Sequence, residues 1–319
     1  MTEIITLDAG RPYTGFKSVQ ITAALDEAAR TFDLTMTEAP GEFSFPPGTE
    51  VDIRASGTLA ARGYVNRYHA DGDSRTHNIK IQGRGKGQDF VDSSADIPKG
   101  HLKNSTPGDL ANQLDKFGVG ISIKVPLREV PNQQVRQGET RETCVERYLR
   151  PQGAEMMGLA DGSIEITNAS VAQSVSAKLV EGINIKRFSV DLSDENRFSE
   201  YTVKGQNREG VGDENLRIKE TINDSGVKRH RPKIIVSETD TDKQRARSRA
   251  QHQKDRNAGE GTKGSVTVVG WRDDDGKLWE PNTLVYVDSP TLMHIVGQML
   301  IERVVLTQDD SSGTTATLS

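Results

Sequence analysis

Hydrophobic and polar residues alternate along the first part of the chain, up to about residue 95. The clearest pairs at a spacing of two are Leu34 and Met36, Val51 and Ile53, and Ile79 and Ile81. This period is typical of strands with one buried face. Turn-forming clusters at 46–48 and 71–74 separate the pairs. Short strands at this spacing predict a small β-barrel or sandwich over residues 1–95.

The period changes between residues 96 and 178. Thr106, Pro107 and Asp109 resemble a helix start with a capping box. The apolar residues that follow at helical spacing, and that we expect on one buried face, are Leu110, Ala111, Leu114 and Phe117. The other expected elements are a helix at about 139–150 and strands at 121–125, around Met156 and at 164–166. Residues 96–178 are therefore predicted to form a small α/β module.

Alternation returns between residues 179 and 319. The pairs are Ile183 and Ile185, Tyr201 and Val203, Val266 and Val268, and Val285 and Val287. A polar segment at about 239–257 interrupts this pattern, and only Ala246 and Ala250 could face a core there. We expect a second β-barrel into which a charged helix, polar almost all round, is inserted.

The first and last segments share an internal repeat. Phe45, Pro47, Thr49, Val51 and Ile53 match Trp279, Pro281, Thr283, Val285 and Val287 at the same spacing. The stretches that follow them are Val65-Asn66-Arg67-Tyr68 and Ile301-Glu302-Arg303-Val304, two residues further displaced in the second copy. Residues 185–188 followed by 201–206 resemble residues 65–68 followed by 79–84 in the same way. Short motifs also recur by chance, but several elements in compatible spacing favour two small β-barrels of similar design. The predicted fold is thus α+β and mainly β, with two such barrels separated by the α/β module.

Composition narrows the possible functions. The chain has 319 residues, of which 34% are hydrophobic and 27% charged, with a net charge of -5. Such a polar composition favours assembly with partner subunits, and the acidic balance argues against a general nucleic-acid-binding surface. Cys144 is the only cysteine, which excludes an intrachain disulfide or a thiolate metal cluster. Neither a signal peptide nor an apolar membrane-crossing stretch is evident, so synthesis and assembly in a cytoplasm are expected.

No motif predicts catalysis, a cofactor or a metal. Residues 83–87 are glycine-rich, but the Gly-Lys-Ser/Thr of a phosphate loop is absent, so a strand-end turn is expected. Residues 273–276 suit a hairpin turn better than a calcium loop. Cys144 lies beside Val145 on a predicted helix, which favours a buried thiol. The histidines show no ligand spacing: His69, His77, His101, His230, His252 and His294.

The basic run within 243–254 is the most conspicuous charge feature. The candidate protein-interaction residues are Lys243, Arg245, Arg247, Arg249 and Lys254. One interpretation is a solvated helix, and the other is a docking surface for an acidic neighbour. Nucleic-acid binding is less favoured because aromatic residues are not interleaved with the basic ones.

Several stretches together resemble one known family. They are residues 62–67 (Arg-Gly-Tyr-Val-Asn-Arg), 79–95 (beginning Ile-Lys-Ile-Gln-Gly-Arg), 138–140 with 145–153 (Val-Glu-Arg-Tyr-Leu-Arg-Pro-Gln-Gly), 161–167 and 201–206 (Tyr-Thr-Val-Lys-Gly-Gln). In these stretches the chain resembles the baseplate hub proteins of Mu-type contractile phage tails, which are related to the N-terminal hub of type VI secretion spike proteins. The last stretch resembles the opening of that family's second barrel.

The resemblance implies a structural subunit of the virion baseplate rather than an enzyme. It implies a homotrimer whose two barrels per subunit form a pseudo-six-fold ring between tail tube, central spike and surrounding wedge proteins. DNA would pass through the pore without specific binding. Because type VI hubs are fused to a needle and this sequence ends at Ser319, the spike is expected to be a separate protein. The alternatives are a tail-tip cell-wall hydrolase and a nucleic-acid-binding β-barrel protein.

Overall fold

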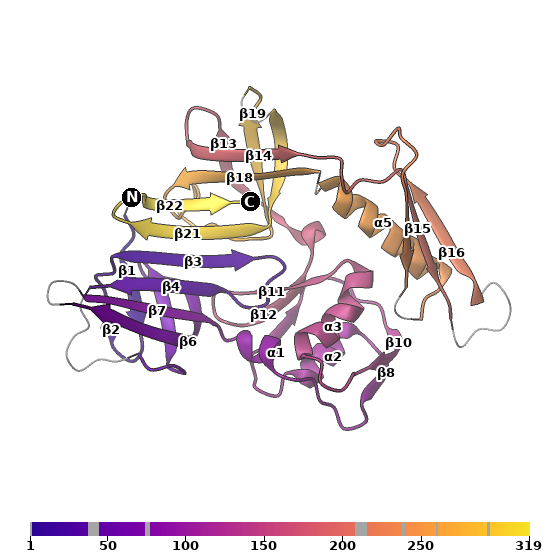
Figure 1. The fold of residues 1–319 in the computed structure, drawn as a ribbon, viewed down its shortest axis with the longest axis horizontal. Coiled ribbons are helices and arrows are strands. Elements are labelled where there is room, and N and C mark those ends of the chain that lie inside the picture. Colours follow the sequence, from indigo (N-terminus) through magenta and orange to yellow (C-terminus); the bar gives the residue numbers. More distant parts are fainter. Residues whose placement is uncertain are drawn as a thin grey trace.

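The computed structural model describes residues 2–37, 45–73, 77–207, 216–237, 240–259, 261–291 and 294–319. Strands account for most of its regular structure and helices for much less, so the mainly β, α+β prediction is confirmed (Figure 1).

The N-terminal strands alternate buried and exposed positions, as their period of two predicts. In β4, for example, Phe32, Leu34 and Met36 are buried and the intervening residues are half-exposed. These strands are β1 (Ile5–Asp8), β2 (Pro12–Tyr13), β3 (Ser18–Ala24), β4 (Thr31–Met36), β5 (Glu50–Ala55), β6 (Thr58–Gly72) and β7 (His77–Gly85).

The strands of the C-terminal half are β13 (Gln173–Val180), β14 (Ile185–Leu192), β18 (Thr262–Val269), β19 (Thr283–Ser289), β20 (Ile295–Ile301), β21 (Arg303–Asp309) and β22 (Gly313–Leu318). Of these, β14, β18, β22 and β21 continue the same sheet, whereas β13, β19 and β20 do not. β21 pairs antiparallel with β3, with Leu306 opposite Ile21. This pair joins the two halves into one eleven-stranded sheet of order β14-β18-β22-β21-β3-β4-β7-β6-β5-β1-β2. Figure 1 shows the C-terminal strands stacked above the N-terminal ones in this sheet.

One apolar core lies behind both halves. It contains Leu34 and Ile53 from the N-terminal half and Val285 and Leu306 from the C-terminal half, all nearly inaccessible. β13, β19 and β20 form a separate three-stranded sheet that closes over this core. Among the described residues the strand pairings run in open orders, so the two closed barrels expected from the sequence are not found.

The two halves nevertheless share a strand order. It is β3-β4-β7-β6-β5-β1 in the first and β14-β18-β22-β21, continued by β20-β19-β13, in the second. In the first half, β6 is one strand with a bulge, and its register shifts between Val65 and Arg67. At the equivalent place in the second half, the strand is interrupted at Glu302, between β20 and β21. One strand pair differs in direction between the halves: β1 and β5 pair antiparallel, whereas the equivalent strands β13 and β19 pair parallel.

The segment repeated in the sequence forms the same turn in both halves. Gly48 and Asn282 both have positive φ, at 91° and 57°. Their N–H groups donate to the carbonyls of Val65 (2.7 Å) and Ile301 (2.8 Å), respectively. The hydroxyl of the next residue, Thr49 in one half and Thr283 in the other, donates to the carbonyl three positions earlier, at 2.7 Å in each.

Part of the expected repeat was wrong. Residues 201–206 were matched to 79–84, but β15 (Glu200–Gly205) pairs with β16 (Ile218–Asn223) and β17 (Pro232–Val236) in a separate sheet. The element that occupies the position of β7 is β22, since both lie beside the bulged or broken strand. Short β motifs look alike in sequence, and only the pairing shows which strands correspond. Ile183, also expected in a strand, lies in a turn and is 79% exposed.

The middle module packs helices on a small sheet around its own core. Its elements are α1 (Gln88–Asp92), β8 (His101–Ser105), α2 (Pro107–Leu114), β9 (Ile121–Ile123), β10 (Val130–Gln134), α3 (Arg141–Leu149), η1 (Arg150–Gln152), β11 (Glu155–Gly158), β12 (Ile164–Thr167) and η2 (Ala169–Val171). The capping box of Thr106 and Asp109 is present as predicted. Phe117, however, is 61% exposed, because α2 ends at Leu114 and the Asp115 carboxylate accepts hydrogen bonds from the following turn.

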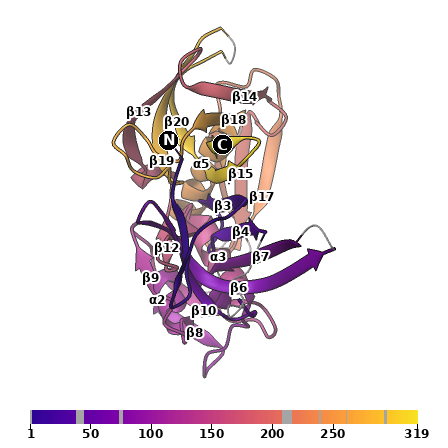
Figure 2. The same cartoon turned by 90° about the vertical axis from the view of Figure 1, so that its left-hand side faces the viewer.

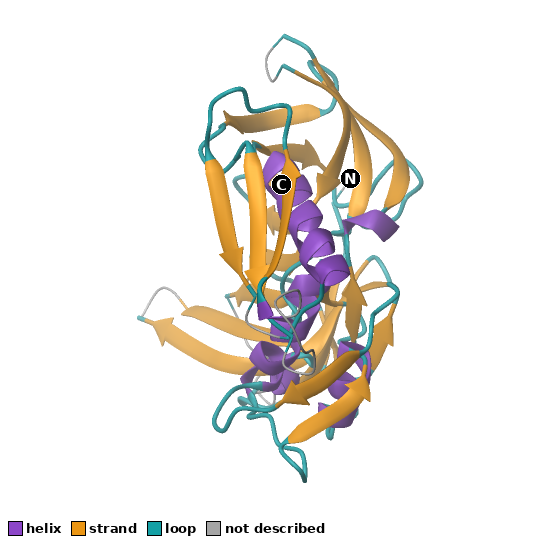
Figure 3. Ribbon diagram, turned by 90° about the vertical axis from the view of Figure 1, so that its right-hand side faces the viewer, coloured by secondary structure: helices purple, strands orange, loops and turns teal. Residues whose placement is uncertain are grey.

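A small unit is inserted between β14 and β18. It consists of the sheet β16-β15-β17 and helix α5 (Lys243–Gly259), which lies across that sheet (Figure 3). Ala246 and Ala250 are fully buried against Tyr201 and Val203, as the sequence predicts. The helix was expected at about 239–257, and Thr239 lies outside the described residues.

Candidate functional site

Cys144 is a buried structural thiol. The side chain is inaccessible, and burial, together with the neighbouring Glu139, raises its pKa to about 12. Because only a thiolate is strongly nucleophilic, this cysteine is protonated and unreactive at neutral pH. Nearby, Glu139 accepts hydrogen bonds from Arg147, and both side chains are more than nine-tenths buried. The group braces α3 against its preceding loop.

The glycine-rich and aspartate-rich segments are turns or close strand contacts. A Cβ on Gly63 would lie 2.0 Å from the carbonyl oxygen of Arg84, and one on Gly83 would meet the Phe32 ring. These glycines let β6 and β7 approach. The carboxylate of Asp273 accepts hydrogen bonds from the amides of Asp275 and Lys277, which closes the hairpin turn predicted there. In the part of the chain that the structure describes, no group of His, Cys, Asp and Glu side chains could hold a metal ion.

The basic helix exposes only part of its charge. Lys243 and Arg247 are exposed, whereas Arg245, Arg249 and Lys254 are half-buried. The polar contacts of α5 reach the middle module rather than solvent alone. Arg245 Nη2 donates to the carbonyl of Glu129 at 3.0 Å, and Nη1 of Arg128 donates to Ser248 Oγ at 3.2 Å.

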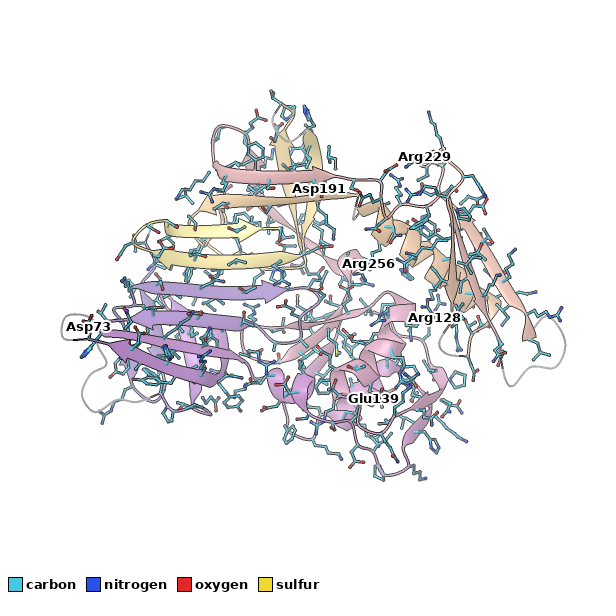
Figure 4. All side chains as sticks on the ribbon, viewed as in Figure 1. Asp73, Arg128, Glu139, Asp191, Arg229 and Arg256 are labelled. Atoms are coloured by element: carbon cyan, nitrogen blue, oxygen red, sulfur yellow. The ribbon has the colours of Figure 1, made fainter. Side chains whose placement is uncertain are left out.

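Glu155 lies at the same boundary and is approached by Arg256, whose Nη1 is 3.4 Å from Oε1 of Glu155. Burial raises the pKa of Glu155, and the Arg256 guanidinium acts in the opposite direction. Figure 4 labels Arg256 on α5 and Arg128 on the middle module, near the boundary between the two. The helix therefore uses part of its positive charge to fasten the inserted unit to the rest of the chain.

Arg30 links the first half, the middle module and the second half. Its side chain is 5% exposed and donates to the carbonyls of Ala60 (2.9 Å) and Gly158 (3.1 Å). Its guanidinium also pairs in a bidentate manner with the carboxylate of Glu280. Two more ion pairs cross between the halves, from Arg272 to Glu3 and from Arg303 to Glu27. Such a set fixes the relative placement of the segments.

Besides its terminal strand β2, the large sheet has open edges at β14 and along the outer part of β6. Among the described residues, β14 pairs only with β18, and residues 67–72 of β6 pair only with β7. Phe188 and Leu192 of β14 are 38% and 57% exposed. Figure 2 shows β6 and β7 extending outward from the lower half of the molecule. Unpaired edges are sites where another chain can add a strand.

The sequence did not predict that these strand edges are open. Residues 67–71 alternate Arg, Tyr, His, Ala, Asp, and residues 187–191 alternate Arg, Phe, Ser, Val, Asp. Both patterns predict strands, but nothing in a single sequence tells whether the neighbour of a strand belongs to the same chain. Within the described residues, no helix is both long and apolar enough to cross a membrane.

Four successive segments of the chain, the last two of which overlap, match domains of known phage tail proteins. Residues 4–85 match the Mu phage baseplate assembly protein GpP-like N-terminal domain, and residues 87–168 match the second domain of baseplate hub protein gp44-like proteins. Residues 197–254 match the third domain of tail protein NMB1110-like proteins, and residues 242–319 match the fourth domain of Mu phage baseplate assembly protein GpP.

Individual relatives match over nearly the full length. The chain is 28% identical to baseplate hub protein gp44 of Escherichia phage Mu over 328 residues, covering 98% of this chain and 86% of the relative. It superposes on the 43 kDa tail protein of prophage MuSo2 from Shewanella oneidensis with a TM-score of 0.87 and 30% identity, covering 99% and 97% of the two chains. The tail protein from Neisseria meningitidis MC58 shares the fold, with a TM-score of 0.83, 19% identity and coverage of 100% and 96%.

Proposed function

The chain belongs to the Mu phage family of baseplate hub proteins, and from this premise we propose that three copies form a ring at the centre of a contractile-tail baseplate. It is a structural protein of the virion tail baseplate. The ring would connect the tail tube to the central spike and to the surrounding baseplate.

The repeated strand order supports this proposal most directly. Each chain carries two halves that use the same order of strands and the same turn at Gly48 and Asn282. Three chains would therefore present six similar halves around one axis. A ring of this kind matches a three-fold spike on one side and a six-fold tube on the other, since duplication converts three-fold into pseudo-six-fold symmetry.

We further propose the following division of labour along the chain. Residues 1–95 and 179–319 would act as the two similar barrel-like units of the ring, with the middle module 96–178 on its periphery. The inserted helix would serve as a docking surface: Lys243 and Arg247 are exposed and would meet an acidic neighbour such as a wedge protein. Arg245, Arg249 and Lys254 would support it from half-buried positions.

The proposed role requires no catalysis. The relatives are structural tail proteins, and the buried, protonated Cys144 does not provide a nucleophile. DNA would pass through the pore without specific binding, which fits the net charge of -5. Peptidoglycan release with turnover by the purified protein would contradict this assignment.

Native mass measurement and electron microscopy of the purified protein test the ring. We expect a species of three times 35.0 kDa and class averages with three-fold symmetry and six-fold modulation. A tail operon lacking this gene should yield no assembled tails, and the wild-type gene should restore them. A monomer at every concentration tested, or normal tails without the protein, would refute the proposal.

A further inference from the structure

Strand β17 forms a free edge of the small inserted sheet. The order of that sheet is β16-β15-β17, and among the described residues β17 pairs only with β15. The N–H of Ser237, just past β17, donates to the carbonyl of Lys204 in β15 at 2.8 Å. Successive residues of a strand direct their backbone groups to opposite sides, so Ile235 also faces β15. Ile234 and Val236 therefore present their N–H and C=O groups to the free edge.

The side chains that accompany these free backbone groups are apolar and exposed. Ile234 is 59% exposed and Val236 is 68% exposed. They lie on the face of the sheet away from α5, because the intervening Ile235 packs on the core that α5 completes. The helix packs on β15 and β16 (Figure 3). An uncovered apolar edge of this kind favours the addition of a further strand.

The other edge strand of the inserted sheet, β16, has a different character. Its exposed residues on the same face are polar: Lys219, Thr221 and Asn223. The two edges of one small sheet thus differ in the same way as a solvent-facing edge and a contact-forming edge. This difference points to β17 as the edge that a partner covers.

The opposite face of the β17 edge is basic. Arg231 and Lys233 lie over the Phe198 ring, with Cζ of the arginine 5.2 Å and Nζ of the lysine 4.9 Å from the ring centroid. The Arg231 guanidinium donates to the backbone carbonyls of Asp194 and Glu195. Within the part of the chain that the structure describes, neither cation is paired with a carboxylate. A carboxylate on an added strand would supply the missing counter-charge.

The inserted unit as a whole has a charge opposite to that of the rest of the chain. Residues 197–259 contain 15 Lys and Arg against 10 Asp and Glu, a formal charge of +5, whereas the whole chain carries -5. Basic residues are concentrated at 228–233, at the beginning of β17, where Figure 4 labels Arg229. An acidic partner is therefore attracted to this unit and repelled by the remainder of the chain.

We propose that the free edge of β17 binds an extended, acidic segment of another protein of the same tail, which adds as a fourth strand to the inserted sheet. The segment alternates apolar side chains, which cover Ile234 and Val236, with acidic ones, which pair with Lys233 and Arg231. Main-chain hydrogen bonds to the free edge provide affinity, and the alternation provides specificity. This inference rests on the proposed baseplate function and concerns a surface separate from the basic residues of α5.

A nucleic acid is the other polyanion that a basic unit attracts. It has no amide backbone to pair with the free N–H and C=O groups of a strand, and it would leave Ile234 and Val236 exposed to water. Phosphate contacts would involve the basic residues alone. The combination of a free edge, apolar side chains and unpaired cations therefore favours a protein segment.

Site-specific photo-crosslinking in assembled tails tests the proposal. The full chain carries benzoylphenylalanine in place of Ile234, and the matched control carries it in place of Lys219, which is exposed on the same face but on β16. After irradiation we expect at least about tenfold more adduct from position 234, because an added strand lies beside β17. Mass spectrometry of the adduct should identify one segment in which acidic and apolar residues alternate.

The other outcomes overturn the proposal. They are an adduct with a second copy of this chain, an adduct with DNA, an adduct with a segment that lacks acidic residues, and an adduct no stronger than that of the control. Tails that contain the chain but show no adduct from position 234 refute the edge contact and leave the proposed hub function intact. Tails that assemble normally without the chain refute the hub function itself.

Two substitutions give an independent readout, the amount of the cross-linked partner recovered with the tagged chain. Lys233→Glu should lower this amount at least about tenfold, because it places like charges opposite one another, whereas Lys219→Glu should leave it unchanged. Ile234→Pro removes one free N–H without breaking a bond to β15 and should also release the partner, while Ile234→Thr retains the N–H. If the proline variant melts at a lower temperature, the Lys233→Glu variant decides. Wild-type recovery with Lys233→Glu would contradict the proposed pairing of charges.

Discussion

The N-terminal and C-terminal halves use one strand scaffold with different connections. In the first half, β3 and β4 are joined by residues 25–30, whereas the equivalent strands β14 and β18 are separated by the whole inserted unit. In the first half β6 bends through a bulge, and in the second the same place is a break at Glu302. The strands that face the common core are kept, and the connections between them have diverged. The difference teaches that a shared core constrains the order of the strands but not the segments that connect them.

The largest expected effect on stability tests whether equivalent buried aromatic residues stabilise the two halves to the same extent. Phe45 and Trp279 precede the matched turns and are 1% and 5% exposed. Phe45→Ala and Trp279→Ala should each lower the free energy of unfolding by about 3–5 kcal/mol, because a large buried ring is lost and a cavity remains. Chemical denaturation of the two variants measures this. A cost below about 1 kcal/mol in only one of them would show that the halves are not equivalent in their cores.

A second prediction concerns the contact between the halves. Arg30→Met leaves the Glu280 carboxylate and two backbone carbonyls without their donor, so we expect a loss of about 3 kcal/mol. The control is Arg303→Met, which breaks the half-exposed pair with Glu27 and should cost less than about 1 kcal/mol. Thermal unfolding followed by circular dichroism compares the two. Equal costs would show that Arg30 does not lock the halves together.

A third prediction separates the inserted unit from both halves. Asp224 is 4% exposed and accepts hydrogen bonds from Arg197, and these contacts lower the pKa of Asp224. A lowered pKa in the folded state means that its stabilisation is present above the unfolded-state pKa. That stabilisation is lost as the pH falls through the folded-state pKa.

Asp224→Asn should therefore destabilise the inserted unit by about 2 kcal/mol at pH 7, and the difference from wild type should shrink as the pH falls below about 4. Hydrogen exchange resolved by segment measures this, with the amides of β15 and β16 as reporters and those of β3 and β4 as internal controls. A pH-independent difference, or equal acceleration in β3 and β4, would argue against a locally stabilised unit.

The sequence predicted strands and helices where a pattern of side chains determines them locally. The strand at 51–53, the capping box at Thr106 and the buried faces of Ala246 and Ala250 are examples. The sequence did not predict correctly which strands pair with one another. β15 resembles β7 in sequence, yet it belongs to another sheet. The basic run was predicted as a protein-interaction site, which stays a prediction, and a single sequence does not show that Arg245 donates to the carbonyl of Glu129.

The open edges illustrate the same limit. The sequence predicted β motifs at 65–68 and 185–188, but it assigned residues 71–74 to a turn, whereas Asp71 and Gly72 lie in β6. An open edge, moreover, is defined by what does not pair with it. Only the three-dimensional arrangement places these two stretches at opposite ends of one run of strands. Their correspondence to β21 and β3 depends on registers that span four strands, which no local pattern encodes.

The smallest expected effect tests the repeat at its most local feature. Thr49 and Thr283 each donate a side-chain hydrogen bond of 2.7 Å to a carbonyl three residues earlier. Thr49→Val and Thr283→Val keep the shape and remove this bond, so each should cost about 1 kcal/mol, with a difference between them of less than about 0.5 kcal/mol. Paired urea titrations measure the two costs, and Thr→Ser at each position should recover part of the loss. A cost at one position and none at the other would mean that the matched turns share a conformation without sharing a role, because the hydroxyl would then stabilise only one of the two halves.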